Sequence, residues 1–168
     1  QLWAIPIQVR NGGITTTVLL DGPETTTTIV DPDGPVVVNA GGSGYYRVDY
    51  DGTLRHRLDV AALADLTTLE RYNLVDDAWA ATIAGRLAAF ELLVMLEAFG
   101  GERDHAVWQA IVIALRGLNR LLDEGAADGS LRRSESDMYF AEVRPFEEIF
   151  RQGEQPPGGE SQQRQGGN

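Results

Sequence analysis

Residues 39 to 52 read NAGGSGYYRVDYDG, and this stretch decides how the fold is interpreted. A glycine cluster leads into two tyrosines, an arginine and two aspartates. The preceding sequence has the pattern of short strands, and the hydrophobic period after it becomes helical. We therefore expect a chain that is α+β by segment, with a β-sandwich over 1–52, a helical domain over 53–150 and a disordered tail over 151–168.

Five short runs before residue 53 are rich in Val, Ile, Thr and Tyr, which favour strands. They span 2–10, 14–20, 24–30, 35–40 and 45–50. Turn residues separate them, and Asn11-Gly12 is the strongest turn signal because both residues tolerate positive φ. The pattern predicts a small antiparallel β-sandwich in which the glycine cluster lets two strands cross closely.

The helical part opens on a capping box, in which Thr67 and Glu70 each bind a backbone N–H at the helix start. Apolar residues then recur every three or four positions, which predicts one buried face; they are Leu69, Tyr72, Val75, Trp79 and Ile83. Glu70, Asn73, Asp76 and Asp77 are expected to point elsewhere, and Gly85 to end the helix.

Three further helical segments follow this helix. The segment 87–99 is apolar nearly all round and is expected to be buried, and 105–123 carries apolar residues at helical spacing. A weaker amphipathic segment spans 134–150. Together these segments predict a set of antiparallel α-hairpins.

Composition excludes several classes of partner. The net charge is −11 and all 14 basic residues are Arg, scattered along the chain, so neither nucleic acid nor an anionic membrane surface is expected to bind. No apolar run approaches the roughly 18 residues that a membrane span needs. Cysteine is absent, which fits a cytoplasmic location. The first residue is Gln1, so we expect the chain to be excised from a longer protein.

The residues that could carry chemistry do not form a known active-site pattern. Ser43 lies in a glycine cluster that leads into a strand rather than a helix, which fits neither a nucleophile elbow nor a phosphate loop. His56 and His105 have no second histidine at zinc-site spacing. The Asp-Gly pairs at 33–34 and 51–52 lack the remaining ligands of a calcium loop and are typical of turns.

Two neighbouring carboxylates, Asp76 and Asp77, cannot face each other on a helix, so they do not form a paired-carboxylate site by themselves. One of them is expected to reach Arg71 or Arg47 as a structural ion pair. By residue chemistry alone, the chain binds or scaffolds.

The order of several segments carries more information than any single residue. WAIPIQV (3–9), VVNAGGSGYYRVDYD (37–51), ERYNLVDDAW (70–79) and ERDHAVW (102–108) together resemble the M1 family of zinc aminopeptidases, aminopeptidase N-like. The resemblance covers about residues 2–124 and places them downstream of the catalytic domain. It implies a β-sandwich spacer followed by the start of the helical C-terminal domain. That domain would then be a truncated helical solenoid, whose exposed apolar faces favour self-association.

The resemblance implies a parent enzyme that removes N-terminal residues from peptides. Family members bind zinc through His-Glu-x-x-His and a downstream Glu, and none of these motifs occurs here. No catalytic or metal residue is therefore carried over, and zinc is expected only in the full-length enzyme. The expected partners are the missing catalytic domain and, through the parent, the peptide substrate.

What the resemblance carries over is architectural: this part is expected to support and cover the active-site chamber. The motif positions expected at the junction of sheet and helices are Asn39, Gly44, Tyr45, Tyr46, Arg47, Tyr50, Arg71, Asp76, Asp77 and Trp108. The competing hypothesis is a stand-alone interaction module without peptidase activity, in which a sheet edge or a helical face binds another protein.

Overall fold

The fold is taken from a computed structural model, which describes residues 4–127 and their side chains as far as Leu122. The described residues up to Leu121 form one compact unit, and of the second unit only the end of the last helix is described. The predicted helix over 134–150 and the predicted disordered tail over 151–168 lie outside the described residues.

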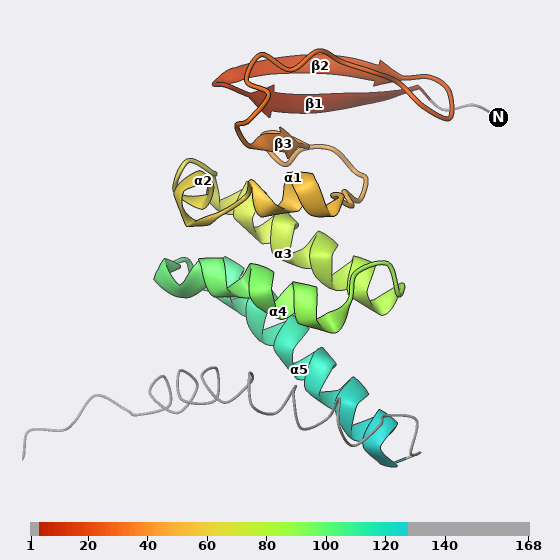
Figure 1. Cartoon of the computed structure of the whole chain (residues 1–168), viewed down its shortest axis with the longest axis vertical. Helices are drawn as coiled ribbons and strands as arrows, with labels where there is room; N and C mark the ends of the chain where they lie inside the picture. The colour runs from red at the N-terminus through yellow and green to blue at the C-terminus, as the bar shows by residue number, and fades with distance from the viewer. Residues whose placement is uncertain (1–3, 128–168) are drawn as a thin grey trace, which may run out of the picture. The chain divides into compact units, whose positions relative to one another are not determined.

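The β part is one antiparallel sheet with the strand order β2-β1-β3 (Figure 1). Its strands are β1 (Ile5–Asn11), β2 (Ile14–Leu20) and β3 (Val36–Val38). Gly12 and Gly13 form the β1–β2 turn, with φ angles of 56° and 77°, and Asn11 pairs with Ile14. The tight turn is where the sequence predicts it, but one residue later than Asn11-Gly12, because two consecutive positive φ angles favour a Gly pair.

Two of the predicted strands are not strands. Residues 24–30 form no ladder, because Asn11 holds the end of this segment: its Oδ1 accepts from the N–H groups of Val30 and Asp31, at 2.9 and 2.7 Å. Residues 45–50 form no ladder either: the N–H of Val48 donates to the side chain of Asp77, and Tyr50 contacts Val38 of β3 through its side-chain hydroxyl. The order of a β part followed by helices is confirmed, while the second layer of a sandwich stays a prediction.

The described helices follow one another closely along the chain, and one of them continues directly into a 3-10 helix. They are α1 (Gly52–His56), α2 (Val60–Ala64), α3 (Thr68–Ile83), α4 (Ala89–Glu97), the 3-10 helix η1 (Ala98–Gly101) and α5 (His105–Ala127). The capping box of Thr67 and Glu70 is confirmed at the start of α3. Gly85 follows the end of α3 with a φ of 70°, as its predicted role as a helix stop requires.

The buried face of α3 differs from the predicted one. Val75 is fully buried, but Leu69 and Ile83 are 48% and 62% exposed. Glu70 and Asp77, which the pattern directs elsewhere, are buried instead. Ion pairs between α3 and the β part determine which face of the helix is buried. The spacing of apolar residues gives no sign of these pairs.

The hydrophobic core runs from β3 through α3 and α4 to α5, with Leu92, Val75 and Val107 as its largest fully buried side chains. In α4 the prediction of burial all round is only partly right, because Phe90 and Val94 are 44% and 40% exposed. Within residues 4–127, no helix is long and apolar enough to cross a membrane.

The contact between α3 and α5 yields a first testable prediction, at Gly117. A Cβ placed on Gly117 would lie 2.2 Å from Cζ2 of Trp79, so the two helices approach each other through the missing side chain. We expect Gly117→Ala to lower the free energy of unfolding by about 1–3 kcal/mol through overpacking, although Ala favours a helix by roughly 1 kcal/mol. Chemical denaturation measures the change.

Gly100→Ala in η1 is the matched control, because no atom lies within 4 Å of its added Cβ. Its unfolding free energy is expected to stay near that of the wild type. A Gly117→Ala variant as stable as the wild type would contradict the close packing of Trp79 on α5.

Candidate functional site

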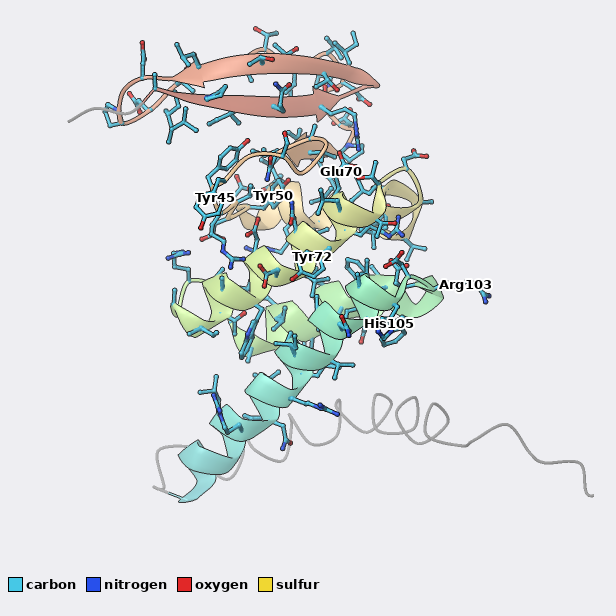
Figure 2. All side chains as sticks on the ribbon, turned by 180° about the vertical axis from the view of Figure 1, so that it is seen from behind. Tyr45, Tyr50, Glu70, Tyr72, Arg103 and His105 are labelled. Atoms are coloured by element: carbon cyan, nitrogen blue, oxygen red, sulfur yellow. The ribbon has the colours of Figure 1, made fainter. Side chains whose placement is uncertain are left out.

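The centre of the candidate site is the carboxylate of Glu70 in the first turn of α3 (Figure 2). Its side chain is only 1% exposed and forms a double ion pair with Arg10 of β1, with Nη1 to Oε1 at 2.8 Å and Nη2 to Oε2 at 2.9 Å. The N–H groups of Gly41 and Thr67 each donate to it as well, both at 2.8 Å. A single carboxylate therefore ties together the first strand, the glycine cluster and the start of α3.

The pKa of Glu70 reports the balance of these contacts. Burial alone would raise the pKa, but the hydrogen bonds from Arg10, Gly41 and Thr67 favour the ionised form and hold the pKa below its ordinary value. Glu70 is thus a fully paired anion, which suits a structural role and not that of a general acid. We call this set of contacts around Glu70 the first clamp.

A second clamp lies two turns further along α3. Arg47 pairs with both Asp76 and Asp77, and its Nη1 lies 3.1 Å from Oδ1 of Asp77. The N–H of Val48 donates to Oδ2 of Asp77 at 3.1 Å. Burial raises the pKa of Asp77 more than these bonds lower it. The predicted ion pair therefore forms with Arg47, and both carboxylates take part.

The tyrosines of the motif, of which Figure 2 labels Tyr45 and Tyr50, have three different surroundings. Tyr45 is fully exposed, whereas the hydroxyl of Tyr46 is buried without a hydrogen-bond partner. The hydroxyl of Tyr50 accepts from the N–H of Val38 at 2.9 Å, and burial raises the pKa of Tyr50 to about 12. Tyr50 closes the outer edge of β3, and none of the three is arranged as an acid or base.

The glycine cluster is a loop closed on itself. Asn39 adopts a φ of 62°, and its side chain accepts from the N–H of Gly44 at 2.7 Å and donates to the Gly44 carbonyl at 3.2 Å. At Gly42, with a φ of 70°, an added Cβ would lie 2.5 Å from Cγ of Leu69. The close approach predicted for the glycines therefore exists, but it is to α3 and not between two strands.

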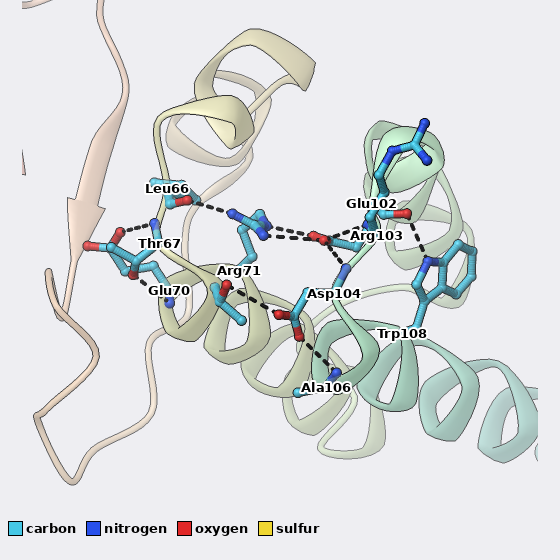
Figure 3. A network of polar contacts seen from close by, with 10 residues as sticks. Leu66, Thr67, Glu70, Arg71, Glu102, Arg103, Asp104, Ala106 and Trp108 are labelled. Atoms are coloured by element: carbon cyan, nitrogen blue, oxygen red, sulfur yellow. Dashed lines mark hydrogen bonds and ion pairs between the residues drawn. The ribbon is translucent and has the colours of Figure 1, made fainter.

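A separate network joins α3 to the start of α5 (Figure 3). Arg71 binds Glu102 through two nitrogens, at 2.6 and 3.2 Å, and donates to the carbonyl of Leu66 at 2.6 Å. The indole N–H of Trp108 donates to the carbonyl of Glu102 at 3.0 Å. Hydrogen bonds from Arg71 and from the N–H groups of residues 103 and 104 outweigh burial and lower the pKa of Glu102.

The structure thus brings eight of the ten predicted junction residues into two groups. The first lies between the β part and α3 and contains Asn39, Gly44, Arg47, Tyr50, Asp76 and Asp77. The second is the network of Arg71 and Trp108. Tyr45 makes no such contact, and the Tyr46 hydroxyl is unpaired.

Sequence reasoning missed Arg10, Asn11 and Glu102 as junction residues. It also assigned Glu70 only to the helix cap. Arg10 lies 60 residues from Glu70, and no local spacing links them. The one available signal was an Arg within a predicted strand, where a charged residue needs a partner if it points inward.

Chemical groups that could hold a metal ion are not assembled in the described part. Over residues 4–127, no group of three or more His, Cys, Asp or Glu side chains is arranged to hold a metal. His105 begins α5, after Asp104, whose Oδ1 accepts from the N–H of Ala106 at 2.9 Å. The buried carboxylates here are bound to Arg side chains and backbone N–H groups, which leaves them suited to holding the fold together.

Comparison with known proteins places this junction in a family. Residues 35–146 match the family described as the ERAP1-like C-terminal domain, which is more than half of the 168-residue chain. The chain belongs to this family. The resemblance to the C-terminal part of M1 aminopeptidases is thereby confirmed, and the match includes the glycine cluster, α3 and the start of α5.

Individual relatives agree with the family. The chain is 31% identical over 116 residues to tricorn protease-interacting factor F2 of Thermoplasma acidophilum, which covers 69% of this chain and 14% of the relative. It is 31% identical over 127 residues to puromycin-sensitive aminopeptidase of Caenorhabditis elegans, and the match covers 71% of this chain and 13% of the relative. It is 28% identical over 95 residues to aminopeptidase M1-A of Oryza sativa subsp. japonica, and the match covers 56% of this chain and 11% of the relative. The chain spans only a small part of the length of these relatives.

The clamp at Glu70 gives a second prediction, for this ERAP1-like domain. Glu70→Gln keeps the shape of the side chain but leaves Arg10 without a buried anion, so we expect a loss of about 2 kcal/mol of unfolding free energy at neutral pH. Denaturant unfolding at several pH values measures it. Because folding lowers the pKa of Glu70, the stability from its charge is full above the ordinary value of 4.5 and is lost as the pH falls through the folded pKa.

The difference between wild type and Glu70→Gln is therefore expected to shrink as the pH falls below 4.5. The matched control is Glu97→Gln, which changes an exposed carboxylate on α4 and is expected to leave stability within about 0.5 kcal/mol of the wild type. A difference that stays constant through the acid range would show that the charge of Glu70 does not stabilise the junction.

Proposed function

We propose that this ERAP1-like domain is the non-catalytic C-terminal part of a zinc-dependent aminopeptidase that removes N-terminal residues from peptides. In this proposal the zinc ligands and the attacking water belong to a catalytic domain elsewhere in the parent polypeptide. The role of the present chain is to support and cover the active-site chamber. Its partners are that catalytic domain and, through it, the peptide substrate.

The observation that carries the proposal is the double clamp between the β part and α3 in a chain whose relatives include named aminopeptidases. A spacer that positions a helical cover over a chamber needs a stiff connection. The clamps at Glu70 and Asp77 supply one, because each joins a backbone N–H group and an Arg side chain of the β part to the same helix.

A cover of this kind acts on catalysis without touching the reacting atoms. It excludes water from the chamber, restricts which peptides enter and keeps the substrate in place. Loss of the cover is therefore expected to affect kcat/KM for peptides more than for small aminoacyl substrates, which need no extended chamber.

The proposal is tested by producing the present chain and the upstream part of the parent as separate proteins. The present chain alone, with zinc and an aminoacyl fluorogenic substrate, is expected to give no turnover above a contamination control. The upstream part of the parent is expected to have reduced kcat/KM on peptides, and adding the present chain is expected to raise it. Enzyme assays with purified pieces measure all three values.

The variants described above supply the control for this reconstitution. Glu97→Gln is expected to restore peptide hydrolysis like the wild-type chain, and Glu70→Gln less well, because the clamp is weakened. Turnover by the present chain alone would overturn the non-catalytic role. Full peptide activity of the upstream part without the chain would overturn the covering role.

A further inference from the structure

The side-chain amide of Asn11 uses every hydrogen-bonding position that it has. Its Oδ1 accepts from the N–H groups of Val30 and Asp31, at 2.9 and 2.7 Å. Its Nδ2 donates to the carbonyls of Asp31 and Pro35, at 2.9 and 3.1 Å. The residue is only 5% exposed. One side chain at the end of β1 therefore holds both ends of the segment 30–35.

The residue that follows Asn11 has to be glycine. Gly12 adopts a φ of 56°, in the left-handed region that favours glycine. A Cβ added to it would lie 2.8 Å from Cγ2 of Val30, so the segment 30–35 leaves no room for a side chain there. The structure is thus tied to the dipeptide Asn11-Gly12, because its first residue binds the segment and its second makes the turn.

An Asn-Gly dipeptide is chemically labile, because glycine has no side chain that would hinder attack on the neighbouring amide. In the reaction, the backbone nitrogen of Gly12 bonds to Cγ of Asn11, and the bond from Cγ to Nδ2 breaks. The departing amide nitrogen takes up the proton of the Gly12 nitrogen and leaves as ammonia. Water then opens the cyclic imide at one of its carbonyls, which yields aspartate or isoaspartate.

The folded β part opposes this reaction. Cγ of Asn11 can turn toward the Gly12 nitrogen only if the amide gives up its bonds to the segment 30–35. The strand partners Ile14 and Val36 also hold the backbone of Asn11 in the sheet. The reaction therefore requires a local opening, and its rate follows the fraction of time that this part of the chain is open.

Either product prevents the opening from being reversed. An aspartate at this position has no N–H to donate, so its carboxylate would face the carbonyl oxygens of Asp31 and Pro35. An isoaspartate adds a carbon atom to the backbone where Asn11 pairs with both Ile14 and Val36. Both pairings at the end of β1 then lose their register.

We propose that Asn11-Gly12 is a deamidation site that the fold protects, and that its reaction makes opening of the β part irreversible. The covalent change accumulates with the time that the segment 30–35 spends away from Asn11, so the site limits how often the chain can open and refold. The bonds that protect Asn11 lie within residues 11–36 of this chain, so the site does not depend on the function proposed above.

The rate of deamidation in the folded and the unfolded chain tests the protection. The wild-type chain is incubated at mildly alkaline pH with and without guanidinium chloride, and peptide mapping by mass spectrometry follows each Asn. We expect Asn11 to react about tenfold or more slowly in the folded chain. Asn73 is the internal control: in denaturant it is expected to react more slowly than Asn11, because the side chain of Leu74 hinders ring closure. Equal rates of Asn11 with and without denaturant overturn the proposal.

A matched pair of variants tests whether the segment 30–35 protects Asn11. Asp31→Ala removes the bond from the N–H of Gly34 to Oδ1 of Asp31, at 3.0 Å, which shapes this segment. Asp33→Ala makes the same change of charge at an exposed side chain that has no partner within the described residues. In the folded chain, we expect deamidation of Asn11 to be about threefold or more faster in Asp31→Ala and unchanged in Asp33→Ala. Equal rates in the two variants overturn the role of the segment.

The chain deamidated at Asn11, which ion exchange separates by its added negative charge, tests the irreversibility. Its denaturation midpoint is expected to be lower, and the fraction of chains that refold on dilution is expected to fall in step with conversion of Asn11, both measured by circular dichroism. Asn11→Asp is expected to share the lower midpoint. Gln8→Glu, the same chemical change at an exposed hydrogen bond of β1, is expected to keep the midpoint of the wild type. Deamidated chains that refold and resist denaturant like the unmodified chain overturn the proposal.

Discussion

The ion pair between Glu70 and Arg10 is the constraint on which the rest of the described structure depends. A carboxylate that is only 1% exposed is costly to bury unless donors surround it, and here four N–H contacts do so. Two come from a side chain of β1 and two from the backbone. The positions of the strand, of the glycine cluster and of the start of α3 are therefore not independent, because each must bring its donor to the same two oxygens.

The unusual backbone of the glycine cluster follows from this constraint. Gly41 has to present its N–H to Glu70 while the chain reverses direction within a few residues, and Asn39 and Gly41 both adopt positive φ. The bonds from Asn39 to Gly44 hold the reversal closed. The five-residue spacing of these two motif positions thus has a physical meaning: the side-chain amide of Asn39 spans a loop of that size. The motif identifies a junction between the β part and α3.

What could be predicted from the sequence was local. The capping box at Thr67 and the stop at Gly85 depend on residues within one helix turn, and both are where the pattern predicts them. The buried face of α3 could not be found in this way, because its polar members are paired with residues far away in the chain, such as Arg10 and Arg47. The segments 24–30 and 45–50 failed as strands for the same reason. The composition of these segments favours strands, but N–H groups of their backbone donate to the side chains of Asn11 and Asp77.

Two clamps fix the direction of α3, which one clamp alone could not do. Glu70 and Asp77 are seven residues apart, or about 10 Å along a helix, and lie on the same face after two turns. A helix that is bound at one end can rotate about that point, whereas a helix that is bound at two points on one face cannot. Their opposite pKa shifts agree with this division: Glu70 has enough donors to outweigh its burial, and Asp77 does not. The contacts of Glu70 therefore favour its ionised form, whereas the burial of Asp77 favours its neutral form.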